Sequence, residues 1–246
     1  MLVYFSKDWN GEPFQLFGPP HVVALLIILA INLFLIYGWK NPSPQARRIF
    51  RFTLAGVLVI VESLWHWWNW SIGDWSIQYM LPLHVCSAMV WLSALMLVTE
   101  NYFLYDFIYF MGIGAASQAL LTPDAGIYGF PHFRFFQVMM SHGAIVTTAV
   151  YLTAIEGFRP TVKSLARVAL GMNLYVAFIM IVNAILTSNY LFIAHKPETP
   201  TLIDAMPPWP YYILVLEALG IVLCLLLYIP FAIKDWQAKK LNPTGF

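Results

Sequence analysis

The chain has 246 residues, of which 60% are apolar and 17% aromatic, while only 10% are charged. Soluble domains carry roughly 25% charged residues, so the composition excludes a water-soluble globule and predicts an integral membrane protein. Thirteen Lys and Arg against twelve Asp and Glu give a formal net charge of +1, which leaves no basic surface to neutralise nucleic acid. Two cysteines are too few for a disulfide framework or a multi-cysteine zinc module. The sequence indicates no cofactor and no protein partner.

Seven segments are long and apolar enough to cross a bilayer. A helical crossing needs roughly 20 mostly apolar residues, and charges, prolines or glycines bound each candidate. The candidates are residues 19–38, 46–70, 80–98, 102–122, 133–154, 163–187 and 209–231. The prediction is an all-α fold, with residues 1–246 forming a single domain of seven transmembrane helices.

The connections between these segments differ in charge, and this difference predicts the orientation. Ten Lys or Arg lie on one side and three on the other: Lys40, Arg47, Arg48, Arg51, Arg159, Lys163, Arg167, Lys234, Lys239 and Lys240 against Lys7, Arg134 and Lys196. Cytoplasmic loops retain positive charge. We therefore expect the N-terminus outside and the C-terminus in the cytoplasm.

One predicted outer connection, residues 188–208, is long and rich in proline and aromatic residues. Proline prevents a continuous helix there, whereas the aromatic residues are unusual for a solvated linker. We interpret it as a semi-rigid cap over the outer face. A stiff connector with interfacial anchors is the alternative.

Polar and ionisable side chains gather in the outer half of the predicted bundle. Such side chains are costly in lipid unless they face the bundle interior or a wet cavity. Six helices contribute to one slab, which predicts a polar chamber that opens outward. Its members are Glu62, His66, Cys86, Gln118, His142, Asn183 and Glu217.

Spacing relates several of these residues. Glu62 and His66 are four residues apart and share one helical face, and His84 and Ser87 share another. Both carboxyl groups, Glu62 and Glu217, are also compatible with neutral structural acids kept protonated by burial.

Cys86 is the predicted nucleophile. Pro82 occupies a position suited to the first turn of a helix, which would place Cys86 near a helix N-terminus, where the macrodipole favours a thiolate. Cys224 lies in an apolar run and is interpreted as a small hydrophobic residue. The sequence lacks zincin, nucleophile-elbow and P-loop motifs, and residues 209–231 contain no lysine for a retinal Schiff base.

Several short motifs resemble a known family. They are Leu81-Pro82-Leu83-His84-Val85-Cys86-Ser87, Leu120-Leu121-Thr122-Pro123-Asp124, Gly129-Phe130-Pro131-His132, Ser141-His142-Gly143, Ser188-Asn189-Tyr190, Lys196-Pro197 and Pro208-Trp209-Pro210-Tyr211. Together they resemble the YwaF-like bacterial membrane proteins, which are related to animal transmembrane protein 164, a polytopic phospholipid acyltransferase. The resemblance covers nearly the whole chain in order.

The resemblance implies that a cysteine takes an acyl chain from a phospholipid and passes it to a lysophospholipid, with a histidine as base. Cys86 and His142 match these roles. His84, Ser87, Gln118, Asn183 and Glu217 are expected to support or bind substrate, and Ser87, Gln118 or Asn183 would donate hydrogen bonds to the oxyanion. Glu62 and His66 would either orient His142 or anchor the headgroup. Water as the acceptor would make the protein a lipid esterase.

Two alternatives use the same residues. In one, His66, His84 and His142 bind zinc and Glu62 is the base of a lipid hydrolase. In the other, the chain is a small-ligand binding protein or transporter in which Glu62 and Glu217 couple protons.

Overall fold

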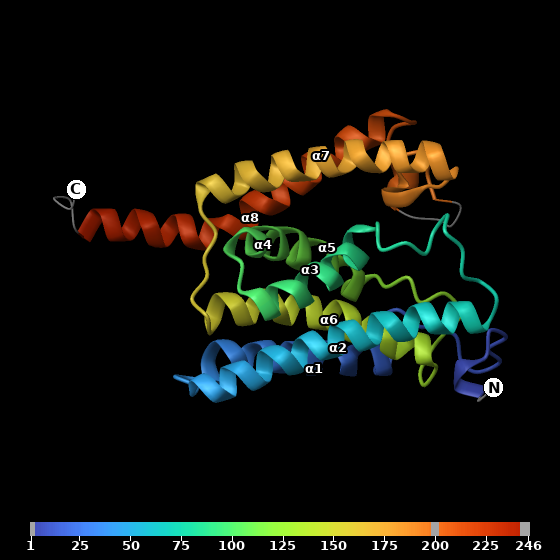
Figure 1. Cartoon of the computed structure of the whole chain (residues 1–246), viewed down its shortest axis with the longest axis horizontal. Coiled ribbons are helices and arrows are strands. Elements are labelled where there is room, and N and C mark those ends of the chain that lie inside the picture. The colour runs from blue at the N-terminus through green and yellow to red at the C-terminus, as the bar shows by residue number, and fades with distance from the viewer. Residues whose placement is uncertain (1–2, 198–201, 242–246) are drawn as a thin grey trace. The chain divides into compact units, whose positions relative to one another are not determined.

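The computed structural model describes residues 3–197 and 202–241, and in this part of the chain every regular element is a helix. The chain divides into two compact units, Met1–Phe158 and Arg159–Phe246. The predicted all-α class is therefore confirmed. Figure 1 shows the helices in colours that run from blue at the N-terminus to red at the C-terminus.

The first unit holds helices α1 to α6. Their bounds are Pro19–Leu33 for α1, which continues as the π-helical turn η2 (Phe34–Gly38), Pro44–Ser71 for α2, Val85–Thr99 for α3, Tyr102–Phe107 for α4, Ile113–Leu121 for α5 and Phe133–Ala154 for α6. A second π-helical turn, η3 (Ile108–Gly112), joins α4 to α5. The second unit holds α7 (Val162–Leu186) and α8 (Tyr211–Leu241).

Six helical spans in the described residues are long and apolar enough to cross a membrane: Pro19–Gly38, Pro44–Ser71, Tyr102–Leu121, Phe133–Ala154, Val162–Leu186 and Tyr211–Ala238. They correspond to six of the seven predicted segments. The remaining segment, 80–98, begins later than expected, because α3 starts only at Val85 and has 15 residues. A helix of that length covers about 22 Å, less than the hydrocarbon core of about 30 Å. Seven crossings and the orientation remain predictions.

Local sequence explains where the long helices begin. Pro44 occupies the first turn of α2, and the Ser43 hydroxyl accepts a hydrogen bond from the Ala46 N–H at 3.2 Å. At α7, Thr161 and Ser164 form a capping box, in which each side chain bonds the other residue's backbone N–H. These side chains satisfy N–H groups that have no partner within the helix.

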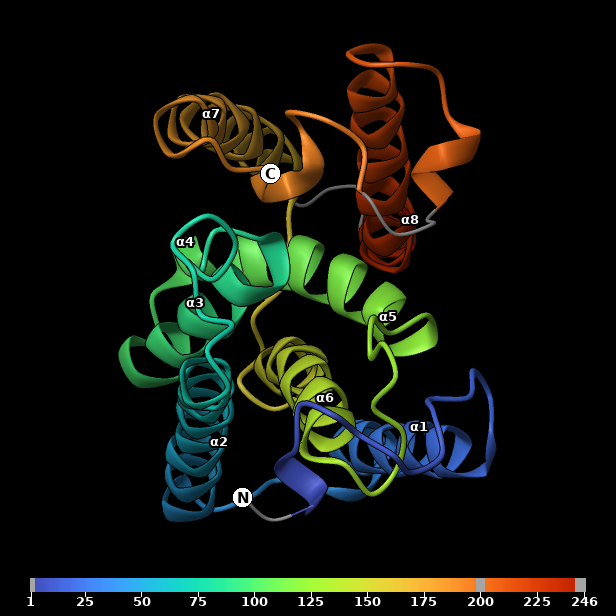
Figure 2. The same cartoon turned by 90° about the vertical axis from the view of Figure 1, so that its right-hand side faces the viewer.

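Helix α6 is the centre of the first unit. It packs against α1, α2, α3 and α5, which surround it in Figure 2. In its most apolar part 72% of the residues are buried, against 17% in α1. Gly143 permits close approach of α1, because a Cβ there would lie 2.9 Å from Ile28 Cδ1. Side chains on any face of α6 can therefore contribute to a functional site between the helices of the first unit.

Ion pairs join helix ends at one end of the first unit. Arg47 Nη1 at the start of α2 lies 3.2 Å from Glu156 Oε2, just after α6. Arg51 pairs with Glu100, just after α3. These pairs fix the ends of α3 and α6 against α2.

The opposite ends of α2 and α6 hold the N-terminal segment through backbone carbonyls. Trp68 Nε1 donates to the Phe5 carbonyl at 2.9 Å, and His132 Nε2 donates to the Ser6 carbonyl at 3.1 Å. Lys7 Nζ lies 2.5 Å from Asp74 Oδ1. The segment is thus anchored to both helices.

We expect the stability of this region to decrease at low pH because of His132. Its Nδ1 accepts the Arg134 backbone N–H at 3.1 Å, so neutral His132 is the N-cap of α6. Burial lowers the pKa of His132 below its ordinary value of about 6.5. The unfolded chain therefore binds the proton more readily, and stability falls as the pH drops below about 6.5. Protonation of Nδ1 also removes the cap, worth about 1 kcal/mol.

Thermal unfolding of the purified chain between pH 5 and pH 7 tests this expectation. The wild type should lose a few degrees of apparent melting temperature at pH 5. His132→Asn keeps an uncharged cap acceptor and should show a flatter profile. An equally steep profile in His132→Asn would assign the pH dependence to other groups.

In the second unit, helix α7 ends in a turn that an asparagine side chain holds closed. Asn183, near the end of α7, closes the turn that follows: its Nδ2 donates to the Tyr190 carbonyl at 3.0 Å, and its Oδ1 accepts from the Tyr190 N–H and the Ser188 hydroxyl, each at 2.8 Å. Part of the predicted cap, residues 198–201, lies outside the described residues, and whether 188–208 covers the site stays a prediction.

Replacing Asn183 should destabilise the protein. All three hydrogen bonds are buried, so Asn183→Ala should lower the free energy of unfolding by about 1–3 kcal/mol. The apparent melting temperature should then fall by several degrees. Asn173→Ala, at an exposed position on the same helix, is the matched control and should cost less. Equal melting temperatures for the two variants would contradict this structural role.

Candidate functional site

Glu62 is the centre of a group of polar side chains between α2, α3 and α6. It lies on α2 with only 3% of its surface exposed. The Ser87 hydroxyl on α3 hydrogen-bonds its carboxylate, and the Arg134 guanidinium on α6 interacts with it electrostatically. Glu62 also interacts electrostatically with Cys86. A carboxylate buried in this way needs such partners, because burying an isolated charge is costly.

Cys86 lies in the first turn of α3, half-buried. The predicted position near a helix N-terminus is therefore confirmed, although the predicted role of Pro82 is wrong. The helix begins after His84, which is its N-cap in an extended conformation (φ −70°, ψ 148°), so Pro82 precedes the first turn. The backbone N–H groups of this turn are oriented to stabilise negative charge.

Arg134 is the cation of the group. Its guanidinium carbon lies 3.9 Å from the centroid of the Trp65 ring, and its Nη2 donates to the Asp124 carbonyl at 3.0 Å. It also donates to the Gln137 side chain and interacts electrostatically with both Glu62 and His142. Arg134 therefore connects α2 to α6.

His142 lies two turns further along α6. Its Nδ1 is 2.8 Å from the Val138 carbonyl, and because a carbonyl only accepts, Nδ1 carries the proton. The other ring nitrogen, Nε2, is then unprotonated in the neutral ring and is able to accept a proton. We call five of these side chains the polar cluster: Glu62, Cys86, Ser87, Arg134 and His142.

His66 borders the polar cluster from α2. Its Nδ1 accepts the Trp75 indole N–H at 3.1 Å, so the proton of the neutral ring is on Nε2, which lies 3.8 Å from Glu62 Oε1. The predicted i,i+4 relation of Glu62 and His66 is confirmed by this distance. Trp75 and Glu62 together fix the orientation of the His66 ring.

The histidines proposed as zinc ligands are not grouped in this way. Within residues 3–197 and 202–241, no three His, Cys, Asp or Glu side chains come close enough to hold a metal ion together. His66, His84 and His142 therefore form no three-ligand site in this structure.

Three other predicted residues lie apart from these contacts. The side chain of Gln118 is exposed on α5. Asn183 and Glu217 belong to the second unit, where Asn183 closes the turn after α7 and Glu217 Oε1 accepts from Asn173 Nδ2 at 3.1 Å. These hydrogen bonds give both side chains a structural role within the second unit.

Arg134 is the residue that sequence reasoning missed. The charge count uses it only to orient the chain, although the predicted segment 133–154 includes it, and it lies in the first turn of α6. A cation there is unfavourable because helix N-termini carry positive partial charge, and charge within an apolar helix is costly. An arginine at the start of an apolar helix was therefore a signal of a buried anionic partner.

These features define an all-helical integral membrane protein whose first unit encloses ionisable side chains between its helices. The chain belongs to the TMEM164 family, whose model matches residues 16–228. The predicted relation to animal transmembrane protein 164 is thereby confirmed, whereas the bacterial YwaF-like label stays a prediction. No curated protein and no solved structure matches the chain.

Proposed function

We propose that the polar cluster transfers an acyl chain between phospholipids through a thioester on Cys86. The observation that carries this proposal is the position of Cys86 in the first turn of α3, where backbone N–H groups favour negative charge. Arg134 interacts electrostatically with both Glu62 and His142 and so relates the base to the same group of side chains. Membership of the TMEM164 family supports the same conclusion.

The first half of the reaction forms the acyl-enzyme. The Cys86 thiol gives its proton to His142 Nε2, and the sulfur attacks the ester carbonyl of a phospholipid. The N–H groups at the start of α3 stabilise the oxyanion. When the carbon–oxygen bond of the ester breaks, the leaving lysophospholipid oxygen takes the proton from His142.

The second half reverses these steps with a new acceptor. The hydroxyl group of a lysophospholipid loses its proton to His142 and attacks the thioester, and the proton then returns to the Cys86 sulfur as the carbon–sulfur bond breaks. If water is the acceptor, the product is a free fatty acid. No cofactor takes part in this scheme.

The remaining members of the polar cluster position these groups. The Glu62 carboxylate balances the Arg134 charge, and the Ser87 hydroxyl bond to Glu62 ties the first turn of α3 to α2. The Val138 carbonyl keeps the accepting nitrogen of His142 unprotonated. Arg134 is also suited to attract the phosphate of a lipid headgroup.

The proposed function also depends on how the chain crosses the membrane. We infer seven crossings, with α3 and the residues before it forming the short one, the N-terminus outside and the C-terminus in the cytoplasm of a bacterial cell. The polar cluster then serves the outer leaflet.

Acyl transfer in proteoliposomes tests the proposed function. The purified chain is reconstituted with a phospholipid that carries an isotope-labelled acyl chain and with an unlabelled lysophospholipid, and lipids are followed by mass spectrometry. We expect labelled chains on the acceptor, and labelled fatty acid where no acceptor is present. Unchanged donor lipid after prolonged incubation would contradict both transfer and hydrolysis.

A further inference from the structure

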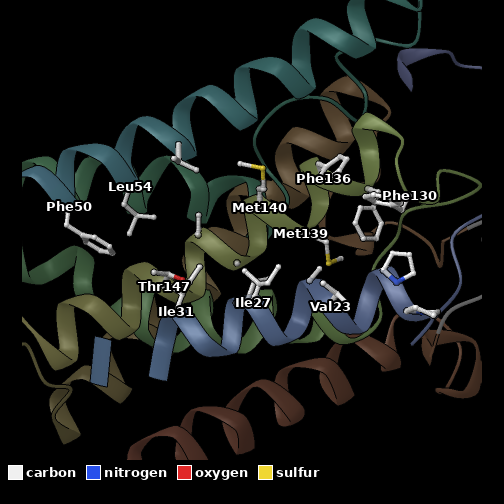
Figure 3. A pocket seen from close by; sticks show the side chains of 18 residues that line it. Val23, Ile27, Ile31, Phe50, Leu54, Phe130, Phe136, Met139, Met140 and Thr147 are labelled. Carbon is white, nitrogen blue, oxygen red and sulfur yellow. The ribbon is translucent and has the colours of Figure 1, made fainter. Parts of the chain in front are cut away.

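A long apolar groove lies between α1, α2 and α6 of the first unit (Figure 3). Its volume is about 680 Å³, within the range of roughly 300–1,000 Å³ typical of small-molecule sites. Apolar side chains form almost all of its wall, among them Val23, Ile27, Ile31, Leu54, Met139 and Met140. The Thr147 hydroxyl in the wall accepts a hydrogen bond from Asn32 Nδ2 at 3.2 Å. The groove thus suits a hydrocarbon ligand.

The groove and Arg134 of the polar cluster lie on opposite faces of α6. Gly143 lines the groove, and nine residues separate it from Arg134. At 100° per residue this places the two about 180° apart around the helix. None of the five residues of the polar cluster lines the groove, so a ligand in the groove would be a second bound molecule.

The dimensions of the groove match one leaflet. Along α1 the wall runs from Pro19 to Ile31, about 18 Å at 1.5 Å per residue, while half of a hydrocarbon core of about 30 Å is about 15 Å. Val23 is 54% exposed and Ile27 55% exposed, so the groove is open along α1. An acyl chain can therefore enter sideways from the bilayer.

A smaller cavity that includes two polar side chains, Glu12 and Gln15, adjoins one end of the groove. This second cavity, of about 190 Å³, includes Glu12 and Gln15 and shares Pro20, Phe130 and Phe135 with the groove. The two cavities together offer an apolar slot that ends beside the exposed polar side chains of Glu12 and Gln15, on the side where α1 begins. That combination matches an amphiphile that lies parallel to the helices.

His21 stabilises the junction of the two cavities. It is 1% exposed, its Nδ1 accepts the Phe17 N–H at 3.0 Å, and its Nε2 donates to the Leu120 carbonyl at 2.8 Å. Because both ring nitrogens are engaged within the protein, His21 holds the loop before α1 against α5. The junction is therefore built into the fold.

We propose that this groove binds one acyl chain of a bilayer phospholipid, with the glycerol and headgroup at the Glu12–Gln15 pocket, as a resident lipid. An empty groove of this size would leave its apolar wall without contacts. The site is independent of the thioester chemistry, and its occupant is not consumed.

Native mass spectrometry of the full chain, purified from membranes in mild detergent, tests the resident lipid. We expect one retained phospholipid per chain. Ile27→Trp fills the groove and should lower the retained fraction at least tenfold, and Val23→Trp should act in the same way. Leu26→Trp, on a neighbouring exposed position (57%) outside the groove, is the matched control and should retain the lipid.

Two further results separate this proposal from the proposed function. Cys86→Ala should retain the lipid, and Ile27→Trp should still form an acyl adduct on Cys86 if that chemistry occurs. Loss of the lipid in Cys86→Ala would assign it to the polar cluster and overturn the proposal. Equal retention in Ile27→Trp and Leu26→Trp, or retention of detergent alone, would also overturn it.

Discussion

Replacing His142 with glutamine is expected to slow acyl transfer by about 10²–10⁴-fold, the usual contribution of general acid–base catalysis. Glutamine is polar, but it does not take up the proton that the Cys86 thiol must lose. The hydrogen bond between His142 Nδ1 and the Val138 carbonyl lies within one helix, so the fold should survive. The rate is measured with the labelled-chain assay in proteoliposomes.

The matched control for this variant is His195→Gln. His195 is exposed in the second unit and bonds the Asn189 side chain. Its replacement should change the rate by less than about twofold. Near wild-type transfer by His142→Gln would show that another group, with Glu62 the nearest candidate, accepts the thiol proton.

Replacing Cys86 with alanine should slow acyl transfer by at least about a thousandfold, because no thioester can form without the nucleophile. The chain contains one other cysteine, Cys224 on α8, which is buried. Cys224→Ala should keep its activity and thus controls for the general effect of removing a thiol. Transfer that persists in Cys86→Ala would exclude a Cys86 thioester.

The helices were largely predictable because apolar length and flanking breakers are local features. Six of the seven predicted segments match long apolar helices. The predicted helix at 80–98 starts too early for a local reason. The residues before Val85 form a turn that ends at His84, whose backbone is extended, so Pro82 precedes the helix. Hydropathy alone does not distinguish an apolar turn from an apolar helix.

The site was less predictable because depth along a helix does not determine which face a side chain occupies. Glu62 and Cys86, both expected in one polar slab, do interact, whereas Gln118 proved exposed on α5. Arg134 was overlooked because the charge count used it only to orient the chain, although the predicted segment 133–154 contains it.

The most direct test of the account is the intact mass of the protein after brief incubation with phospholipid and quenching in acid. We predict an added mass equal to one acyl chain on the wild type and on Cys224→Ala, removed by neutral hydroxylamine as expected for a thioester. Cys86→Ala should carry no such adduct. An adduct of the same mass on Cys86→Ala, or no adduct on a wild type that transfers acyl chains, would contradict a covalent role for Cys86.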